Sequence, residues 1–325
     1  MAERTADEQL TKYLTDAHSI EEQALQQLRS APRLAGDAEL AAAFRAHVAE
    51  TERHERLVRG RLEARGAEPS RLKDLAMRAG GLGFVLFARF QPDTSGKLTA
   101  HAFSYEHLEI AAYELLLRVA ERAGDDETVA AARSILEDER AMASRLADNF
   151  DRAVDASLRE LGTDDLGLQL RKYLADAHAI EAQAIQLLER GPKLAGDPQL
   201  ERIYREHLEE THAHQRRVRE RIEALGGDPS GLKDAAMRVG ALNWGLFFQT
   251  HPDTPGKLAA FAYAFEHLEI AGYEELKRVA ARLDDAATVE LAERILADER
   301  AAADKVHGAF GRAVEASFAA VGVAA

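Results

Sequence analysis

The sequence predicts an all-α protein built from two tandem four-helix bundles. Residues 9–158 reappear as residues 169–318 at a constant offset of 160, without a gap. Alanine, leucine, glutamate and arginine dominate both copies, and the alternating apolar pattern typical of strands is absent. Because this period is too long for a solenoid repeat and suits an independent domain, we expect one domain at 1–160 and a second at 161–325.

Four long helical segments are expected in the first repeat, at 8–30, 37–65, 96–123 and 126–158. Each segment carries an apolar seam with a spacing of three and four residues, as a helix facing a bundle core should. The links inside the first and second helix pairs are short and contain Gly36 and Gly124. Short links favour antiparallel neighbours, so each pair is expected to form a hairpin.

A longer passage rich in proline and glycine joins the second and third helices, at about 66–95. We expect it to be a crossover that carries a short apolar helix. Among four-helix bundles, a single long crossover is the ferritin-like arrangement, so the expected fold is a ferritin-like four-helix bundle in each repeat. The aromatic residues of this crossover are expected to cap the bundle: Phe84, Phe87, Trp244, Phe247 and Phe248.

The composition excludes several classes of function. Acidic residues outnumber basic ones by 56 to 42, giving a net charge of −14, which argues against nucleic acid and anionic membranes as partners. There is no cysteine, so thiolate metal sites, iron–sulfur clusters and cysteine nucleophiles are excluded. No apolar run is long enough to span a bilayer, and no signal peptide is visible, so we expect a cytoplasmic protein.

Glutamates interrupt the apolar seams near the middle of every helix. Glu21 and Glu50 lie equally far from the first turn, and Glu109 and Glu139 lie equally far from the second. Each is about 15 residues, or roughly 22 Å of helix, from its turn, so the four helices can present carboxylates in one layer. Buried carboxylates are costly unless protonation, a basic partner or a metal ion neutralises them.

The spacing of these residues predicts a metal site in each repeat. Glu106 and Glu109 share a helix face, and so do Glu50 and His54, with His47 on the same stripe. Either His54 or His47, with its copy His214 or His207, is expected to supply the nitrogen ligand. Carboxylates with imidazole suit iron or manganese, with zinc as an alternative, and up to two ions per domain. The expected ligands are Glu21, Glu50, His54, Glu106, Glu109 and Glu139, repeated as Glu181, Glu210, His214, Glu266, Glu269 and Glu299.

A second interpretation stays open from the residues alone. The central acids can instead be protonated or paired in a non-catalytic helical protein that binds no metal and interacts through its apolar crossover. Metal content would separate the two interpretations.

The chain resembles the YciE/YciF-like stress proteins of the ferritin-like superfamily, which are related to rubrerythrins. The most specific matching string is Glu106-His107-x-Glu109-Ile110-Ala111-Ala112-Tyr113, with Asp138-Glu139-Arg140-Ala141 on the next helix and copies of both in the second repeat. The resemblance implies a carboxylate-bridged metal centre, a link to bacterial stress responses, and either Fe(II) oxidation or consumption of O₂ or peroxide.

Two features depart from the pattern of the resembled family. Separately, the repeat suggests how the two domains pair. The usual Glu-x-x-His motif is missing, because Arg53 and Met142 stand three residues after the glutamates. Without cysteine, the chain has no rubredoxin-type electron donor of its own. Since the resembled family pairs as a dimer, we expect the two repeats to pack as an intramolecular pseudo-dimer.

Overall fold

The computed structural model describes residues 5–68, 94–159, 163–227 and 254–323, and every regular element in these ranges is a helix. The prediction of an all-α protein is therefore confirmed. The chain forms two compact units, whose main parts are Met1–Ser157 and Leu158–Ala320. Within the described ranges, no helix has the length and apolar character needed to cross a membrane. The expected pairing of the two repeats stays a prediction.

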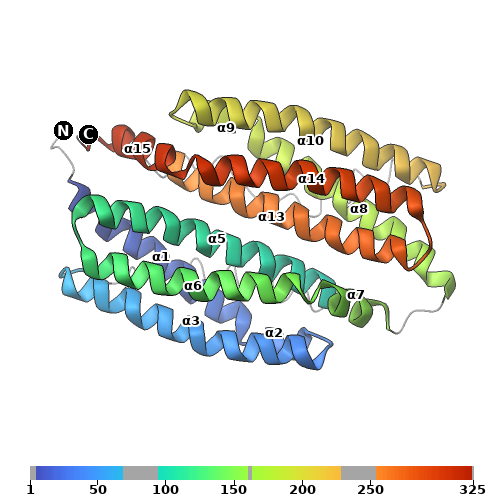
Figure 1. Ribbon diagram of the computed structural model, residues 1–325, viewed down its shortest axis with the longest axis horizontal. Helices are drawn as coiled ribbons and strands as arrows, with labels where there is room; N and C mark the ends of the chain where they lie inside the picture. The colour runs from blue at the N-terminus through green and yellow to red at the C-terminus, as the bar shows by residue number, and fades with distance from the viewer. Residues whose placement is uncertain (1–4, 69–93, 160–162, 228–253, 324–325) are drawn as a thin grey trace. The chain divides into compact units, whose positions relative to one another are not determined.

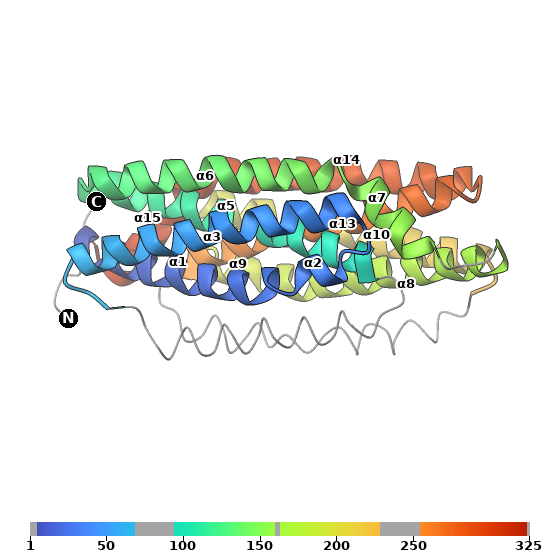
Figure 2. The ribbon, with the colours of Figure 1, turned by 90° about the horizontal axis from the view of Figure 1, so that it is seen from below.

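Four long helices make up most of the first unit (Figure 1): α1 (Ala6–Leu28), α3 (Ala38–Ala64), α5 (Thr94–Ala123) and α6 (Asp126–Ala147). Helices α1 and α6 each pack against both α3 and α5, and Figure 2 shows the same four elements lengthwise. The expected bounds of the first three helices are close to those observed. The crossover helix and its aromatic residues lie outside the described residues.

The second unit repeats this arrangement with α8 (Thr163–Leu188), α10 (Pro198–Ala224), α13 (Thr254–Ala281) and α14 (Ala286–Gly308). A short helix follows the first long one in each unit, α2 (Ala31–Leu34) and α9 (Gly191–Leu194). The tight turn between α5 and α6 needs a residue with positive φ. Gly124 supplies it with a φ of 70°, and Asp284 supplies it in the second unit with a φ of 53°. Aspartate is among the few residues that tolerate this conformation.

The fourth expected helix is broken in two, which corrects the single span of 126–158. Helix α6 ends at Ala147 and α7 (Phe150–Leu158) begins after it; in the second unit α14 is followed by α15 (Phe310–Val321). At the first break, the side chain of Asn149 donates to the carbonyl of Arg145 at 2.7 Å and so competes with the helical pattern. The new direction lets Ser157 Oγ accept from Gly96 N at 2.8 Å, at the start of α5.

One pair of contacting core residues differs between the two units. In the second unit a Cβ added at Gly191 would lie 3.1 Å from Cγ of Tyr204, so a side chain there would require the ring to shift by a few tenths of an ångström. The first unit has Ala31 and the smaller Phe44 at the corresponding places. The extra hydroxyl of the tyrosine is thus accompanied by the loss of a methyl group opposite its ring.

Asp125 joins the start of α6 to the end of α3 in the first unit. Its carboxylate accepts from Thr128 N at 2.9 Å as the N-cap of α6, and it pairs with Arg61 and Arg65, both at 2.9 Å. Burial acts to raise the pKa of Asp125, but the hydrogen bond from Thr128 and the charge of Arg61 outweigh it, so the pKa is lowered. Asp285 has the same cap and pairs with Arg221, but Leu225 replaces the second arginine.

We expect Asp125→Ala to destabilise the protein by about 1–2 kcal/mol, because it removes a helix cap together with its ion pairs. The loss should be smaller for Asp285→Ala, which breaks only one pair with arginine. Chemical denaturation measures both, with Glu137→Ala on the exposed face of α6 as the control. Equal, negligible effects of the two aspartate variants would contradict this assignment.

Candidate metal centre

Two groups of metal-ligating side chains meet in the middle of the first unit. The first group comes from α3, α5 and α6, and the second from α1, α3 and α6; within each group, one ligand atom per residue lies within 4.8 Å of the others. Glu139 belongs to both groups. The members are His47, Glu106, Glu109 and Glu139 in the first group, and Glu21, His54 and Glu139 in the second.

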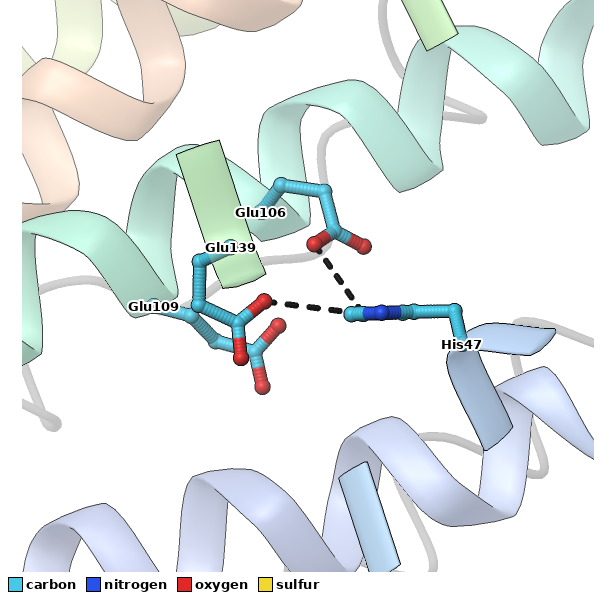
Figure 3. Close-up of side chains that lie close together, drawn as sticks. All are labelled: His47, Glu106, Glu109 and Glu139. Atoms are coloured by element: carbon cyan, nitrogen blue, oxygen red, sulfur yellow. Dashed lines mark ion pairs between the residues drawn. The ribbon is translucent and has the colours of Figure 1, made fainter. Parts of the chain in front are cut away.

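The two histidines approach Glu139 from opposite sides of its carboxylate. His47 Nε2 lies 3.5 Å from one oxygen and His54 Nδ1 lies 2.8 Å from the other. His47 Nε2 is also 3.1 Å from Glu106 Oε2, and Figure 3 shows its ring pointing from α3 toward the carboxylates of α5 and α6. His54 Nδ1 is 3.9 Å from Glu21 Oε2. Glu139 therefore links the two groups through its two oxygens.

Most ligand atoms of this cluster have no hydrogen-bond partner although they are buried. The orphaned atoms are Glu21 Oε2, His47 Nε2, His54 Nδ1, Glu106 Oε2, and both oxygens of Glu109 and Glu139. His54 Nδ1 and Glu139 Oε1 are close, yet they do not meet as a hydrogen bond. Buried polar atoms normally find a partner, so a group of such atoms in one place needs an explanation.

The other nitrogen of each histidine is held by a carboxylate nearer the surface. His47 Nδ1 lies 2.8 Å from Glu50, and His54 Nε2 lies 3.0 Å from Asp138. These outer acids leave Nε2 of His47 and Nδ1 of His54 facing the cluster. A metal-bound histidine typically has such a carboxylate on its other nitrogen, where it fixes the orientation of the ring.

The second unit reproduces this geometry. His207 Nε2 lies 2.7 Å from Glu266 and 3.4 Å from Glu299, while His214 Nδ1 lies 2.8 Å from Glu299. Glu210 and Asp298 hold the outer nitrogens, each at 3.1 Å. The corresponding atoms are again without partners, including both oxygens of Glu269 and of Glu299 and Oε2 of Glu181. Two sequences that agree at only about half of their positions thus keep one arrangement.

Burial and like charges shift the proton equilibria of the cluster. Burial raises the pKa of Glu21 to about 8, although Tyr113 donates a hydrogen bond to it, and burial raises that of Glu109 well above its usual range. Burial acts to lower the pKa of His47, but the charge of Glu106 outweighs it and raises the pKa to about 10. Without a cation, part of the cluster is therefore held protonated.

Five of the six residues expected as ligands in each repeat lie in these groups, and one does not. Glu50 and Glu210 lie outside the groups, with side chains 29% and 38% exposed, and contact the histidines instead. His47 and His207 lie in the groups instead. Both candidate histidines of each repeat therefore face the cluster, although the sequence had left the choice between them open. The spacing of His47, Glu50 and His54 identified the stripe but not which member faces inward.

Asp138 and Asp298 were not predicted as site residues. They precede Glu139 and Glu299 directly, so their side chains lie on a different face of the helix. The available signal was indirect: a buried histidine ligand needs an acceptor for its second nitrogen, and an acid stands next to the bridging glutamate.

The first unit has a further group that the second lacks. His18, Glu22 and Glu55 lie close together, with His18 Nε2 2.9 Å from Glu55. The second repeat has Ala182 and Gln215 in place of the two acids. Arg59 already pairs with Glu55 from outside.

A family model described as a domain of unknown function, DUF892, matches the chain twice, at residues 5–159 and 169–319. The two matches cover the two repeats and nearly the whole chain. No solved structure matches the chain.

The metal-free protein should lose stability as pH rises from 5 to 8. The Glu21 carboxyl ionises near 4.5 when unfolded but only near 8 when folded, so the folded state binds more protons in this window and rising pH favours unfolding. Glu181 acts in the same direction, since burial raises its pKa to about 8. The double variant Glu21→Gln, Glu181→Gln should show a smaller fall. Melting temperatures across this window test it, and a rise with pH in the wild-type protein would contradict the shifts.

Proposed function

We propose a metal-binding function for this chain, which belongs to the DUF892 family. In the proposal each repeat is a ferritin-like four-helix bundle that holds two divalent ions. One ion would be bound by Glu21, His54 and Glu139, and the other by His47, Glu106, Glu109 and Glu139. The second repeat would use Glu181, His214 and Glu299, and His207, Glu266, Glu269 and Glu299.

The observation that carries the proposal is the set of orphaned ligand atoms. They come from four helices, are buried, and converge without hydrogen-bonding one another. A cation is the partner that would satisfy all of them at once, since carboxylate and imidazole offer it lone pairs rather than protons. The same set of atoms is orphaned in both repeats, which argues against an accident of side-chain placement.

Charge balance supports two divalent ions in each repeat. Four carboxylates lie at the centre, and the two histidines bind metals in their neutral form. Two divalent ions would cancel the four negative charges and stabilise the ionised carboxylates that burial disfavours. Hard oxygen ligands with imidazole favour iron or manganese, whereas soft metals prefer the thiolates that this chain lacks.

A bound redox-active pair would supply oxidation of Fe(II), or reduction of O₂ or peroxide, as the resemblance to bacterial stress proteins suggests. The chain's own residues bind and orient: the glutamates provide the charge, and the outer acids Glu50 and Asp138 fix the imidazoles. The phenol of Tyr113 donates to Glu21 and is positioned to hold one of its oxygens in place. Electrons for repeated turnover would have to come from a separate donor.

The alternative is a non-catalytic helical protein whose central acids are protonated. The hydrogen bond from Tyr113 to Glu21 is compatible with it. Glu109 favours the metal, because a protonated carboxyl still needs a partner and neither of its oxygens has one.

Metal content is the direct test. After loading with Fe(II) or Mn(II) under argon and removal of excess metal, elemental analysis should find up to two ions per repeat. The pair of changes Glu106→Gln, Glu109→Gln should remove an ion only from the first repeat, namely the one assigned to His47, Glu106, Glu109 and Glu139, and Glu266→Gln, Glu269→Gln should do the same only in the second. Glu137→Gln on the exposed face of α6 should change nothing. Protein that retains no metal after loading would leave the non-catalytic alternative.

The outer acids provide a second test. Asp138→Asn should weaken metal binding in the first repeat by about 10–100-fold, because it removes the carboxylate that orients His54. Asp298→Asn should do the same in the second repeat. Competition with a chelator of known affinity measures the change. Unaltered affinity in both variants would show that the pairs of histidine with aspartate only stabilise the fold.

A further inference from the structure

A small cavity reaches the metal-ligand cluster of the first repeat from the side of α1 and α5. Its volume is about 20 Å³, enough for one water-sized group, and Glu106 and Glu109 form part of its wall. The remaining polar wall consists of Gln27, His101 and Tyr105. Glu109 is 1% exposed and both of its oxygens lack a hydrogen-bond partner, so the inner end of the cavity meets a carboxyl group without a hydrogen-bond partner.

These polar residues form a continuous stripe along α5. His101, Tyr105 and Glu109 follow one another at intervals of four residues and therefore lie on one face of the helix. His101 is half-buried, whereas Tyr105 and Glu109 are buried, so the stripe runs from near the surface to the cluster. Gln27 on α1 lies beside its outer end, with its Oε1 3.2 Å from His101 Nε2. Tyr105 hydrogen-bonds to Gln23 Oε1 of α1 at 3.1 Å.

The second repeat has replaced this stripe by hydrocarbon. The residues that correspond to Gln27, His101 and Tyr105 are Leu187, Phe261 and Phe265. The ligands of the centre are retained in the same repeat, so only the approach to them differs. Leu187 and Phe265 are buried, like their polar counterparts.

We propose that the stripe of Gln27, His101 and Tyr105 is the entry path by which a divalent cation reaches the centre of the first repeat, and that the second repeat has lost this path. The inference rests on the proposed function. A cation that leaves water needs oxygen or nitrogen atoms along its way, since an unpaired charge among apolar groups is very costly. Amide, imidazole and phenol are weak ligands, which pass an ion on to the carboxylates of Glu106 and Glu109. Leucine and phenylalanine offer no such atoms.

Uptake of Co²⁺ by the metal-free protein, followed by its absorbance in a stopped-flow instrument, tests the path. The wild-type chain should show two phases that differ by about tenfold or more in rate, given the cost of taking an ion through apolar surroundings. Glu106→Gln, Glu109→Gln should lower the amplitude of the fast phase, and Glu266→Gln, Glu269→Gln that of the slow one. These variants assign each phase to its repeat.

The triple change Gln27→Leu, His101→Phe, Tyr105→Phe should slow the fast phase to the rate of the other. It installs residues that the sister repeat already accommodates, and the reverse change Leu187→Gln, Phe261→His, Phe265→Tyr should speed the slow phase. Replacing a residue of the path should lower the association and dissociation rates by the same factor and leave Kd unchanged. Replacing a residue with a purely structural role would change Kd.

Each outcome separates the two proposals. The path is supported if the rates of the two phases exchange when the stripe residues are exchanged between the repeats while Kd stays constant. Equal rates in the two wild-type repeats, or a fast phase that survives the triple change, overturn it and leave the metal centre intact. Absence of any Co²⁺ retention at equilibrium overturns the metal function itself, and the path with it.

Discussion

The burial of four carboxylates at one level is the constraint on which the rest of each unit depends. Such a layer repels itself, and the protein around it is organised to make it tolerable. Two histidines approach Glu139 from opposite sides, outer acids hold their far nitrogens, and Tyr113 secures Glu21. The four long helices bring these groups to the same height because their glutamates lie at similar distances from the connecting turns. A core filled only with leucine would be easier to fold, so stability alone does not account for the arrangement.

The sequence predicted the helices and the layer because both follow from periodicity and chain length. Distances from two turns placed Glu21, Glu109 and Glu139 together. Rotation about the helix axis was harder to predict: His47, Glu50 and His54 share a stripe, and only packing decides which of them faces inward. The break after Ala147 coincides with a local hydrogen bond of Asn149, but the second unit breaks at the same place with Ala309 there, and no pattern of apolar residues predicts either break. The sequence pattern did not indicate Asp138, because the role of this residue is to contact another side chain.

The two repeats have kept the centre and changed its surroundings. Every proposed ligand has its counterpart, whereas the group formed by His18, Glu22 and Glu55 and the polar stripe on α5 occur only in the first repeat. Substitutions of this kind do not change the charge or the geometry of the proposed ligands. They change the residues that surround the ligands. A chain with two such units can therefore carry two centres of one composition and different accessibility. Fusion of the units guarantees that the two kinds occur in equal number.

The exchange of Ala31 and Phe44 for Gly191 and Tyr204 bears on how the duplication persists. Similar tandem stretches of a gene recombine with one another, and each crossover joins part of one repeat to part of the other. A crossover between these two positions would place an alanine methyl group against the tyrosine ring, 3.1 Å from its Cγ. The ring would then have to shift by a few tenths of an ångström in the core of the hybrid. Paired core substitutions of this kind place a small packing cost on such hybrids.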